Sequence, residues 1–191
     1  MLTFFFMGCA YLFGSISGAI LLCQFYHFPD PRTQGSKNPG ATNIWRLHGA
    51  DKACFVLLFD VLKGTIPVYC AYLFDTAPFG LGLIAVAACI GHMMPVFFSF
   101  NGGKGVATAF GAMAPIDPWL ACCLVLIWLL ILYTTKYVSL AAVMTALIAP
   151  VLTHFFDETF VMPVAMLSVL IVFRHRANLR RLVEGFETKF D

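Results

Sequence analysis

The sequence predicts an all-α integral membrane protein, a compact bundle of about seven transmembrane helices, some short or incomplete, with the N-terminus outside and the C-terminus cytoplasmic. The 191 residues are 60% hydrophobic and only 12% charged, and the mean hydropathy is +0.85. The apolar residues form seven runs separated by polar breaks. A soluble domain needs more polar surface than this. No repeat or composition shift divides the chain, so residues 1–191 are expected to form a single polytopic membrane domain.

The lengths of the apolar runs predict the individual spans. In chain order the runs cover residues 3–26, 53–74, 79–98, 105–116, 119–134, 138–153 and 159–173. A helix needs roughly 20 residues to cross the hydrocarbon core, and the first three runs are long enough. The last four are shorter, which implies a compact bundle, a thinned bilayer or incomplete crossings. The expected number of crossings is therefore between about five and about seven.

The first two spans carry features beyond apolar length. Gly14 and Gly18 have the small-xxx-small spacing that lets helix backbones approach, and packing is favoured as their role. Asp60 and Lys63 lie three residues apart on one face of the second span. A buried pair that supports a site is the favoured interpretation, and direct ligand contact is the alternative.

The basic residues predict the orientation. Loops 27–52, 99–104 and 135–137 and the tail 174–191 carry eleven of the twelve Lys and Arg residues, and only Lys63 lies elsewhere. The opposite loops carry no Lys or Arg and contain Asp75, Asp117, Asp157 and Glu158. Because loops rich in Lys and Arg stay in the cytoplasm, this alternation predicts a multi-pass protein of the bacterial cytoplasmic (inner) membrane.

The first polar cluster is Gly35-Ser-Lys-Asn-Pro-Gly-Ala-Thr-Asn-Ile-Trp-Arg46, which no span would tolerate. Its glycines let the backbone approach a ligand, and its neutral hydrogen-bonding side chains and two cations suit a phosphorylated ligand. The candidate binding residues are Ser36, Asn38, Gly40, Thr42, Asn43 and Arg46.

The second cluster spans residues 91–108 and places Lys104 among glycines at the start of an apolar helix. Free N–H groups at a helix N-terminus attract anions, so an anion cradle is predicted. A Walker A loop is excluded, because Phe98 stands where that motif needs glycine and Gly105 where it needs Ser or Thr. The candidates are Gly102, Gly103, Lys104, Gly105 and Thr108, with His92 in support.

The third cluster, residues 173–187, follows the last span. A stop-transfer anchor would explain its arginines. It would not need His175 and Asn178, which lie three apart on one helical face, so a contribution to a site is preferred. All three clusters fall on the predicted cytoplasmic side, where Arg46, Lys104 and Arg174 would supply enough charge for two anionic groups side by side.

Four patterns in order resemble the bacterial acyl-phosphate:glycerol-3-phosphate acyltransferase (PlsY) family over nearly the whole chain. They are G-S-x-N-P-G-A-T-N-x-x-R at 35–46, D-x-L-K-G at 60–64, G-H-x-x-P-V-F-x-x-F-x-G-G-K-G-V-A-T at 91–108 and R-H-R-x-N-x-x-R-L-x-x-G at 174–185. The resemblance implies transfer of a fatty acyl group from acyl phosphate to the 1-hydroxyl of sn-glycerol 3-phosphate. The products would be lysophosphatidic acid and phosphate, in the first acylation step of phospholipid synthesis.

The resemblance also implies roles for individual residues. Functional positions of the family match Ser36, Arg46, Lys104, His175 and Asn178. Glycerol-phosphate binding is implied for Gly102, Gly103 and Gly105, and a role in structural integrity for Glu187. Met94 and Asn101 depart from the family's commoner Phe and Lys, which suggests only a less basic rim.

The implied chemistry needs proximity and charge stabilisation, because acyl phosphate is already activated. No cofactor or metal is expected, since the sequence has no H-E-x-x-H and no paired Cys/His ligand set. The H-x4-D dyad of other glycerolipid acyltransferases is missing too. Either His175 or a substrate phosphate would take the hydroxyl proton. A covalent Ser36 intermediate is disfavoured, because no base is evident beside Ser36.

The expected partners are acyl phosphate, glycerol 3-phosphate and membrane lipid, with other lipid-synthesis enzymes as a further class. A net charge of only +2 argues against nucleic acid. A transporter or channel for a phosphorylated anion is the main alternative function. It would need polar residues across the full membrane depth, whereas here they concentrate at one face. A structural subunit would leave the Ser, Asn, His and Gly positions unexplained.

Overall fold

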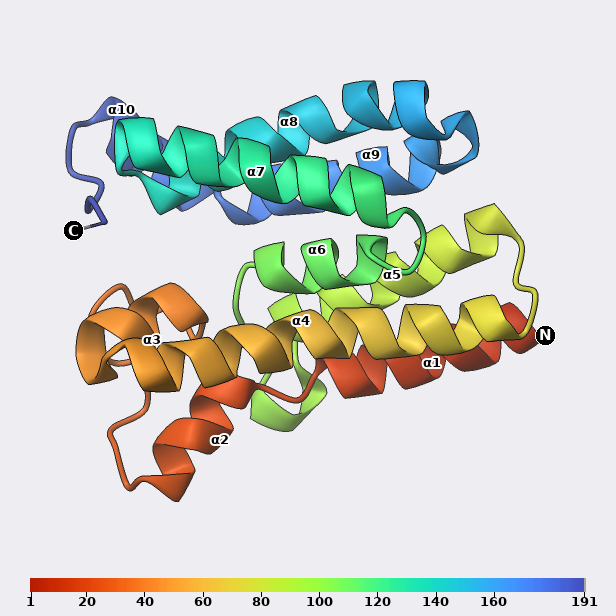
Figure 1. The fold of residues 1–191 in the computed structure, drawn as a ribbon. Coiled ribbons are helices and arrows are strands. Elements are labelled where there is room, and N and C mark those ends of the chain that lie inside the picture. The colour runs from red at the N-terminus through yellow and green to blue at the C-terminus, as the bar shows by residue number, and fades with distance from the viewer. Residues whose placement is uncertain (191) are drawn as a thin grey trace.

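The computed structural model describes residues 1–190, and these are helical throughout apart from connecting loops (Figure 1). In order, the elements are α1 (Leu2–Gly14), α2 (Gly18–Phe25), α3 (Ala41–His48), α4 (Ala50–Leu73), α5 (Pro78–Met93), the 3-10 helix η1 (Val96–Phe98), α6 (Val106–Met113), α7 (Pro118–Thr135), α8 (Val138–Phe156), the 3-10 helix η2 (Glu158–Phe160), α9 (Val161–Arg174) and α10 (Arg176–Val183).

Helix length and apolarity identify a multi-pass membrane protein. Within residues 1–190, five segments are long and apolar enough to cross a membrane: 2–25, 50–73, 78–98, 118–135 and 138–156. A sixth is possible if α9 and α10, which meet at 55°, count as one bent span. Seven crossings are therefore not confirmed. The predicted span 105–116 contains only α6, whose eight residues reach about 12 Å of the roughly 30 Å hydrocarbon core.

The first predicted span is broken rather than continuous. Helix α1 ends at Gly14 and α2 begins at Gly18, with residues 15–17 between them. Both glycines are packing positions, as the small-xxx-small spacing predicted. A Cβ on Gly14 would overlap the carbonyl oxygen of Ala88 in α5, and one on Gly18 would lie 2.9 Å from the Phe59 ring of α4. The two glycines therefore pack against two different helices, Gly14 against α5 and Gly18 against α4.

Helices α5 and α6 lie between α1–α4 on one side and α7–α10 on the other (Figure 1). Glycines bring α6 against α4, because a Cβ on Gly64 would overlap the Thr108 carbonyl and one on Gly111 the Val61 carbonyl. The outer faces of α4 and α7 expose large apolar side chains such as Leu58 and Leu130, as expected of surfaces that meet lipid.

The two termini lie at opposite ends of the bundle, and α3 and α10 share the end that carries the C-terminus (Figure 1). Two of the three polar clusters are thereby brought to one end, and the third precedes α6.

Candidate active site

Asn43 shapes the first polar loop. Its side chain is fully buried in α3, its oxygen accepts the Ser36 N–H at 2.9 Å, and its NH2 group donates to the carbonyls of Pro31 at 3.0 Å and Gln34 at 3.1 Å. A Cβ on Gly35, which has φ +57°, would overlap the Asn43 oxygen. Asn43 therefore holds the loop in place, and its predicted contact with substrate stays a prediction.

The other neutral residues of this loop remain open to a ligand. Ser36 is exposed, and Asn38, Gly40 and Thr42 are half-buried. The side chains of Ser36, Asn38 and Thr42 make no hydrogen bond to any residue between 1 and 190. Gly40 is the N-cap of α3, and a Cβ there would lie 2.9 Å from the Asn38 amide nitrogen. These positions keep the binding capacity that the sequence predicted.

Arg46 reaches the end of the chain. Its guanidinium Nη2 donates to the carbonyls of Lys189 at 3.1 Å and Thr188 at 3.5 Å. Residues 186–190, here called the strap, are also tied down by Phe190, whose N–H donates to the Lys136 carbonyl at 2.7 Å and whose ring lies 5.8 Å from Trp45. Because neutral carbonyls bind a guanidinium less strongly than a phosphate does, an anion could displace them.

The glycine loop is built differently from the prediction. The N–H groups of Gly102 and Gly103 donate to the carbonyls of Met93 at 3.2 Å and His92 at 3.1 Å. Arg174 donates to the other side of the same loop, from Nη2 to the Gly102 carbonyl at 2.8 Å and from Nε to the Gly103 carbonyl at 2.9 Å. The two glycine N–H groups and Arg174 hold the loop in this structure, and their contact with substrate stays a prediction.

The free donors of this cluster follow the glycines. Gly105, at φ +78°, turns the chain into α6. Within residues 1–190, the N–H groups of residues 104–108 make no hydrogen bond, because the first N–H paired in α6 is that of Ala109, with the Gly105 carbonyl. These N–H groups and the Lys104 ammonium are the donors that this cluster offers to an anion. Thr108 is fully buried with its backbone against α4, and its predicted contact with substrate stays a prediction.

Lys104 lies where the three clusters meet. The pKa of its ammonium is lowered to about 8: burial lowers it most, Glu187 opposes this effect, and the charges of Arg181, Arg174 and Arg46 add to it. These charges come from α3, α9, α10 and the strap. The predicted convergence of the clusters is thus observed in the structure.

His175, between α9 and α10, is 2% exposed. Its Nδ1 lies 2.8 Å from the Ile171 carbonyl oxygen. A carbonyl only accepts, so Nδ1 carries the hydrogen and Nε2 keeps the lone pair. Burial and then the Lys104 charge lower the pKa of His175 to about 4. The imidazole is therefore neutral at physiological pH, as its cationic surroundings predicted, although burial is the larger cause.

Glu187, in the strap, binds side chains of α8 and α10, among them Asn178. Its carboxylate accepts the Asn178 amide, the Ser139 hydroxyl at 2.8 Å and the Arg181 Nε at 2.8 Å. Burial alone would raise the pKa of Glu187, but these hydrogen bonds outweigh it and lower the pKa. Glu187 thus joins the strap to α8 and α10, which agrees with its predicted supporting role. Sequence reasoning missed Ser139, Arg181 and the strap carbonyls, since no local pattern links them to the site.

Asp60 and Lys63 form a buried pair, with the Lys63 Nζ 2.9 Å from the Asp60 Oδ1 and side chains only 1% and 4% exposed. His92 approaches the same carboxylate, with Nδ1 at 3.6 Å. Their burial favours the supporting interpretation over direct ligand contact. In residues 1–190, no group of three or more His, Cys, Asp or Glu side chains is placed to hold a metal.

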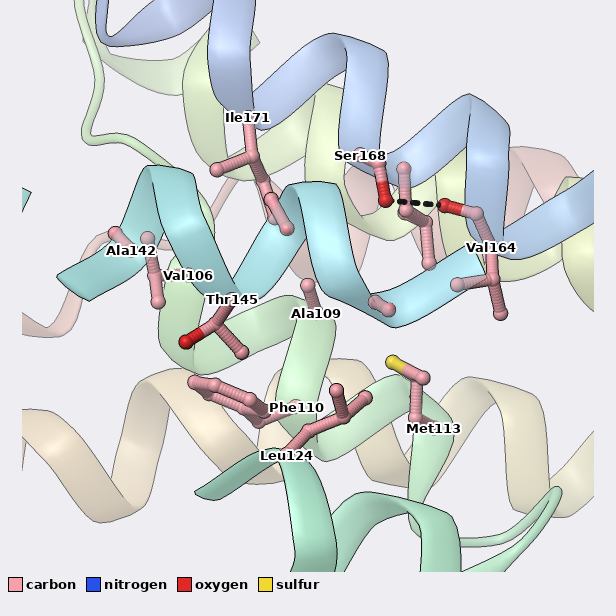
Figure 2. Close-up of a pocket in the computed structure, with 13 residues that line it drawn as sticks. Val106, Ala109, Phe110, Met113, Leu124, Ala142, Thr145, Val164, Ser168 and Ile171 are labelled. Carbon is pink, nitrogen blue, oxygen red and sulfur yellow. Dashed lines mark hydrogen bonds between the residues drawn. The ribbon is translucent and has the colours of Figure 1, made fainter. Parts of the chain in front are cut away.

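A small apolar cavity lies between α6, α7, α8 and α9 (Figure 2). Its lining includes Val106, two residues after Lys104, and Ile171, whose carbonyl contacts His175. Within it, the Ser168 hydroxyl donates to the Val164 carbonyl at 2.9 Å. A volume of about 30 Å³ holds about one water molecule, so a larger occupant requires the helices to part.

A basic, partly buried anion site at one end of an apolar helical bundle defines an integral membrane protein that handles phosphorylated ligands at the bilayer boundary. The sequence model of the family described as glycerol-3-phosphate acyltransferase matches residues 4–185. The chain belongs to the glycerol-3-phosphate acyltransferase family.

Curated relatives and solved structures agree with this assignment. The chain is 56% identical over 188 residues to a glycerol-3-phosphate acyltransferase of Shewanella sp. strain W3-18-1, covering 98% of this chain and 93% of the relative. It is 58% identical over 180 residues to that of Shewanella baltica strain OS155, covering 94% and 89%.

Two crystal structures of PlsY, an integral membrane glycerol 3-phosphate acyltransferase, resemble the fold. The glycerol 3-phosphate form has a TM-score of 0.92 and 35% identity, and the match covers 99% of this chain and 96% of that one. The lysophosphatidic acid form has a TM-score of 0.90 and 34% identity, with 99% and 95% covered.

Proposed function

We propose that this membrane acyltransferase moves a fatty acyl group from acyl phosphate to the 1-hydroxyl of sn-glycerol 3-phosphate. The ester C–O bond forms as the acyl–phosphate bond breaks, and lysophosphatidic acid and inorganic phosphate leave. The observation that carries the proposal is that Arg46 and the neutral His175 both lie close to Lys104. Two phosphates must lie side by side in this reaction, and these cations with the free α6 N–H groups supply the charge stabilisation.

The two phosphates would have different partners. Lys104 and the unpaired N–H groups of residues 104–108 form one binding position. Arg46 forms the other once a phosphate replaces the carbonyls of Thr188 and Lys189. Ser36, which is exposed on the loop that precedes α3, would orient a substrate through its hydroxyl. The strap therefore has to yield when substrate binds.

The geometry favours a substrate phosphate over His175 as the proton acceptor. A group with a pKa of about 4 is a weak base at neutral pH, whereas a phosphate monoester has its second pKa near ~6. The Nε2 lone pair of His175 can still accept a hydrogen bond from the 1-hydroxyl and aim its oxygen at the acyl carbon. The proton then leaves on phosphate. Asn178, fixed by Glu187, would orient the developing oxyanion.

We propose that the site faces the cytoplasm of a bacterial inner membrane. The loops on the side of the three clusters carry eleven of the twelve Lys and Arg residues, in line with the positive-inside rule. The acyl chain would come from the bilayer and pass between helices. The cavity of Figure 2 is a candidate path for this chain, because its lining includes Val106, two residues after Lys104, and Ile171, four residues before His175.

The test is turnover by the purified protein in detergent. The protein is given glycerol 3-phosphate with either acyl phosphate or acyl-CoA, in chelated buffer, and lysophosphatidic acid is measured by mass spectrometry. We expect product from acyl phosphate alone. Lys104→Met should abolish it, whereas Lys52→Met, which removes a half-buried cation paired with the exposed Asp51, should not. Product from acyl-CoA at an equal rate would overturn the proposed donor. Uptake of glycerol 3-phosphate into liposomes without acylation would favour a transporter.

A further inference from the structure

The break in the first span leaves a polar backbone inside the protein. Ser15 is fully buried, and its N–H and that of Ile16 are satisfied by carbonyls of α1. The Ile16 carbonyl has no backbone partner in the described chain and accepts instead from the Lys63 Nζ at 3.0 Å. Irregular backbone at membrane depth persists only where protein groups satisfy it. Lys63 is therefore tied to the break as well as to Asp60.

Asp60 connects Lys63 to His92. Its Oδ1 lies 2.9 Å from the Lys63 Nζ and 3.6 Å from the His92 Nδ1. The His92 Nδ1 is buried and makes no hydrogen bond within residues 1–190. Among residues 1–190, the charged groups that face this histidine from neighbouring helices are Asp60, Lys63 and Arg174. A carboxylate at this distance orients the ring by favouring a hydrogen on Nδ1.

His92 is the last link, because it touches the glycine loop twice. Its carbonyl accepts the Gly103 N–H at 3.1 Å, and its ring occupies the space where a Gly103 Cβ would stand, overlapping Nε2. Gly103 precedes Lys104 directly, and Arg174 grips its carbonyl from the other side. The position of the His92 ring therefore limits how closely the backbone at Gly103 can approach α5, and so it fixes where the backbone of Lys104 lies.

We propose that His92 and Asp60 are positioning residues for the acyl transfer, which fix Lys104 through contact of the His92 ring with Gly103. The inference rests on the proposed function for its kinetic readout. The buried contacts run from the helix break through Lys63, Asp60 and His92 to the glycine loop. In this proposal none of these three side chains touches substrate. Its effect on the reaction passes entirely through the placement of the Lys104 ammonium.

A double-mutant cycle tests this coupling in the purified full-length protein. The variants are His92→Asn, Gly103→Ala and both together. Asn keeps a donor near Asp60 but removes the part of the ring at Gly103, so it makes room for the new methyl group. Each single change should raise the KM for glycerol 3-phosphate about tenfold, since small misplacements cost up to ~100-fold. The double variant should be no worse than the poorer single variant.

The controls separate positioning from folding. Loss of folded protein lowers kcat and leaves KM unchanged, so an unchanged KM in His92→Asn would overturn the proposal. Independent, multiplying effects in the double variant would overturn it too. His154→Asn, an exposed histidine with its side chain 57% accessible, should match the wild type.

A binding measurement distinguishes failure of this inference from failure of the proposed function. Inorganic phosphate should raise the melting temperature of the wild type through Lys104, and raise it less in His92→Asn. If the wild type makes no lysophosphatidic acid but the two shifts differ, the proposed reaction fails and the positioning role stands. Equal shifts in both proteins would overturn the positioning role. Should His92→Asn fail to fold, His92→Gln replaces it in the same comparison.

Discussion

Raising the pH through 8 should switch off substrate binding by discharging Lys104. Burial and the neighbouring arginines bring the pKa of its ammonium to about 8, well below the ordinary value of ~10.4. The charged fraction is then ~90% at pH 7, ~50% at pH 8 and ~10% at pH 9. Because only the ammonium binds phosphate, kcat/KM for glycerol 3-phosphate should fall about tenfold between pH 7 and pH 9.

The assay measures initial rates in detergent between pH 6 and pH 9.5, after subtracting spontaneous hydrolysis of acyl phosphate in blanks. Lys104→Arg is the informative variant, since a guanidinium stays charged over this range. Its activity at pH 7 is expected to be lower, but its profile should stay flat above pH 8. A wild-type profile that is flat to pH 9, or an equal fall in Lys104→Arg, would refute the assignment of this titration to Lys104.

Three further outcomes are expected. Arg46→Lys should lower turnover about 100-fold, because one ammonium cannot replace a two-pronged guanidinium; near-normal kinetics would exclude phosphate recognition by Arg46. Deleting the residues after Glu187 removes the carbonyls that occupy Arg46 and should lower the KM for glycerol 3-phosphate about fivefold; a higher KM would mean that the strap assists binding. Gly64→Ala should destabilise the fold by about 1–3 kcal/mol in thermal unfolding, because its methyl overlaps the Thr108 carbonyl, whereas Gly8→Ala, in open space, should not.

The sequence predicted the features that depend on local composition. Apolar length located α4, α7 and α8 to within three residues at every end. The placement of basic residues predicted that the polar clusters would meet, and the charges around Lys104 bear this out. Both features follow from the burial of apolar surface and the exclusion of charge from the bilayer, which act along the chain without reference to distant partners.

The break between α1 and α2 could not be predicted in the same way. Residues 15–17 are Ser, Ile and Ser, which an apolar helix tolerates. What stabilises the break is Lys63, whose Nζ reaches the Ile16 carbonyl from 47 positions further along the chain. Such a contact exists only once the helices are packed.

In the site, the sequence could not separate residues that bind a ligand from residues that hold the loops. Asn43 and Arg174 carry the same donors in either role. Their partners, such as the Gln34 and Gly103 carbonyls, decide which role each one has. The sequence therefore predicted which loops come together, but not which of their side chains hold those loops in place.

A structure with glycerol 3-phosphate and a non-hydrolysable acyl phosphonate bound would test the central claim most directly. We expect one phosphorus group on Lys104 and the first turn of α6, and the other on Arg46 in place of the Thr188 and Lys189 carbonyls. The 1-hydroxyl should face Nε2 of His175. Phosphorus groups bound elsewhere, or an Arg46 still holding the strap, would contradict the claim that the three clusters form one acyl-transfer site.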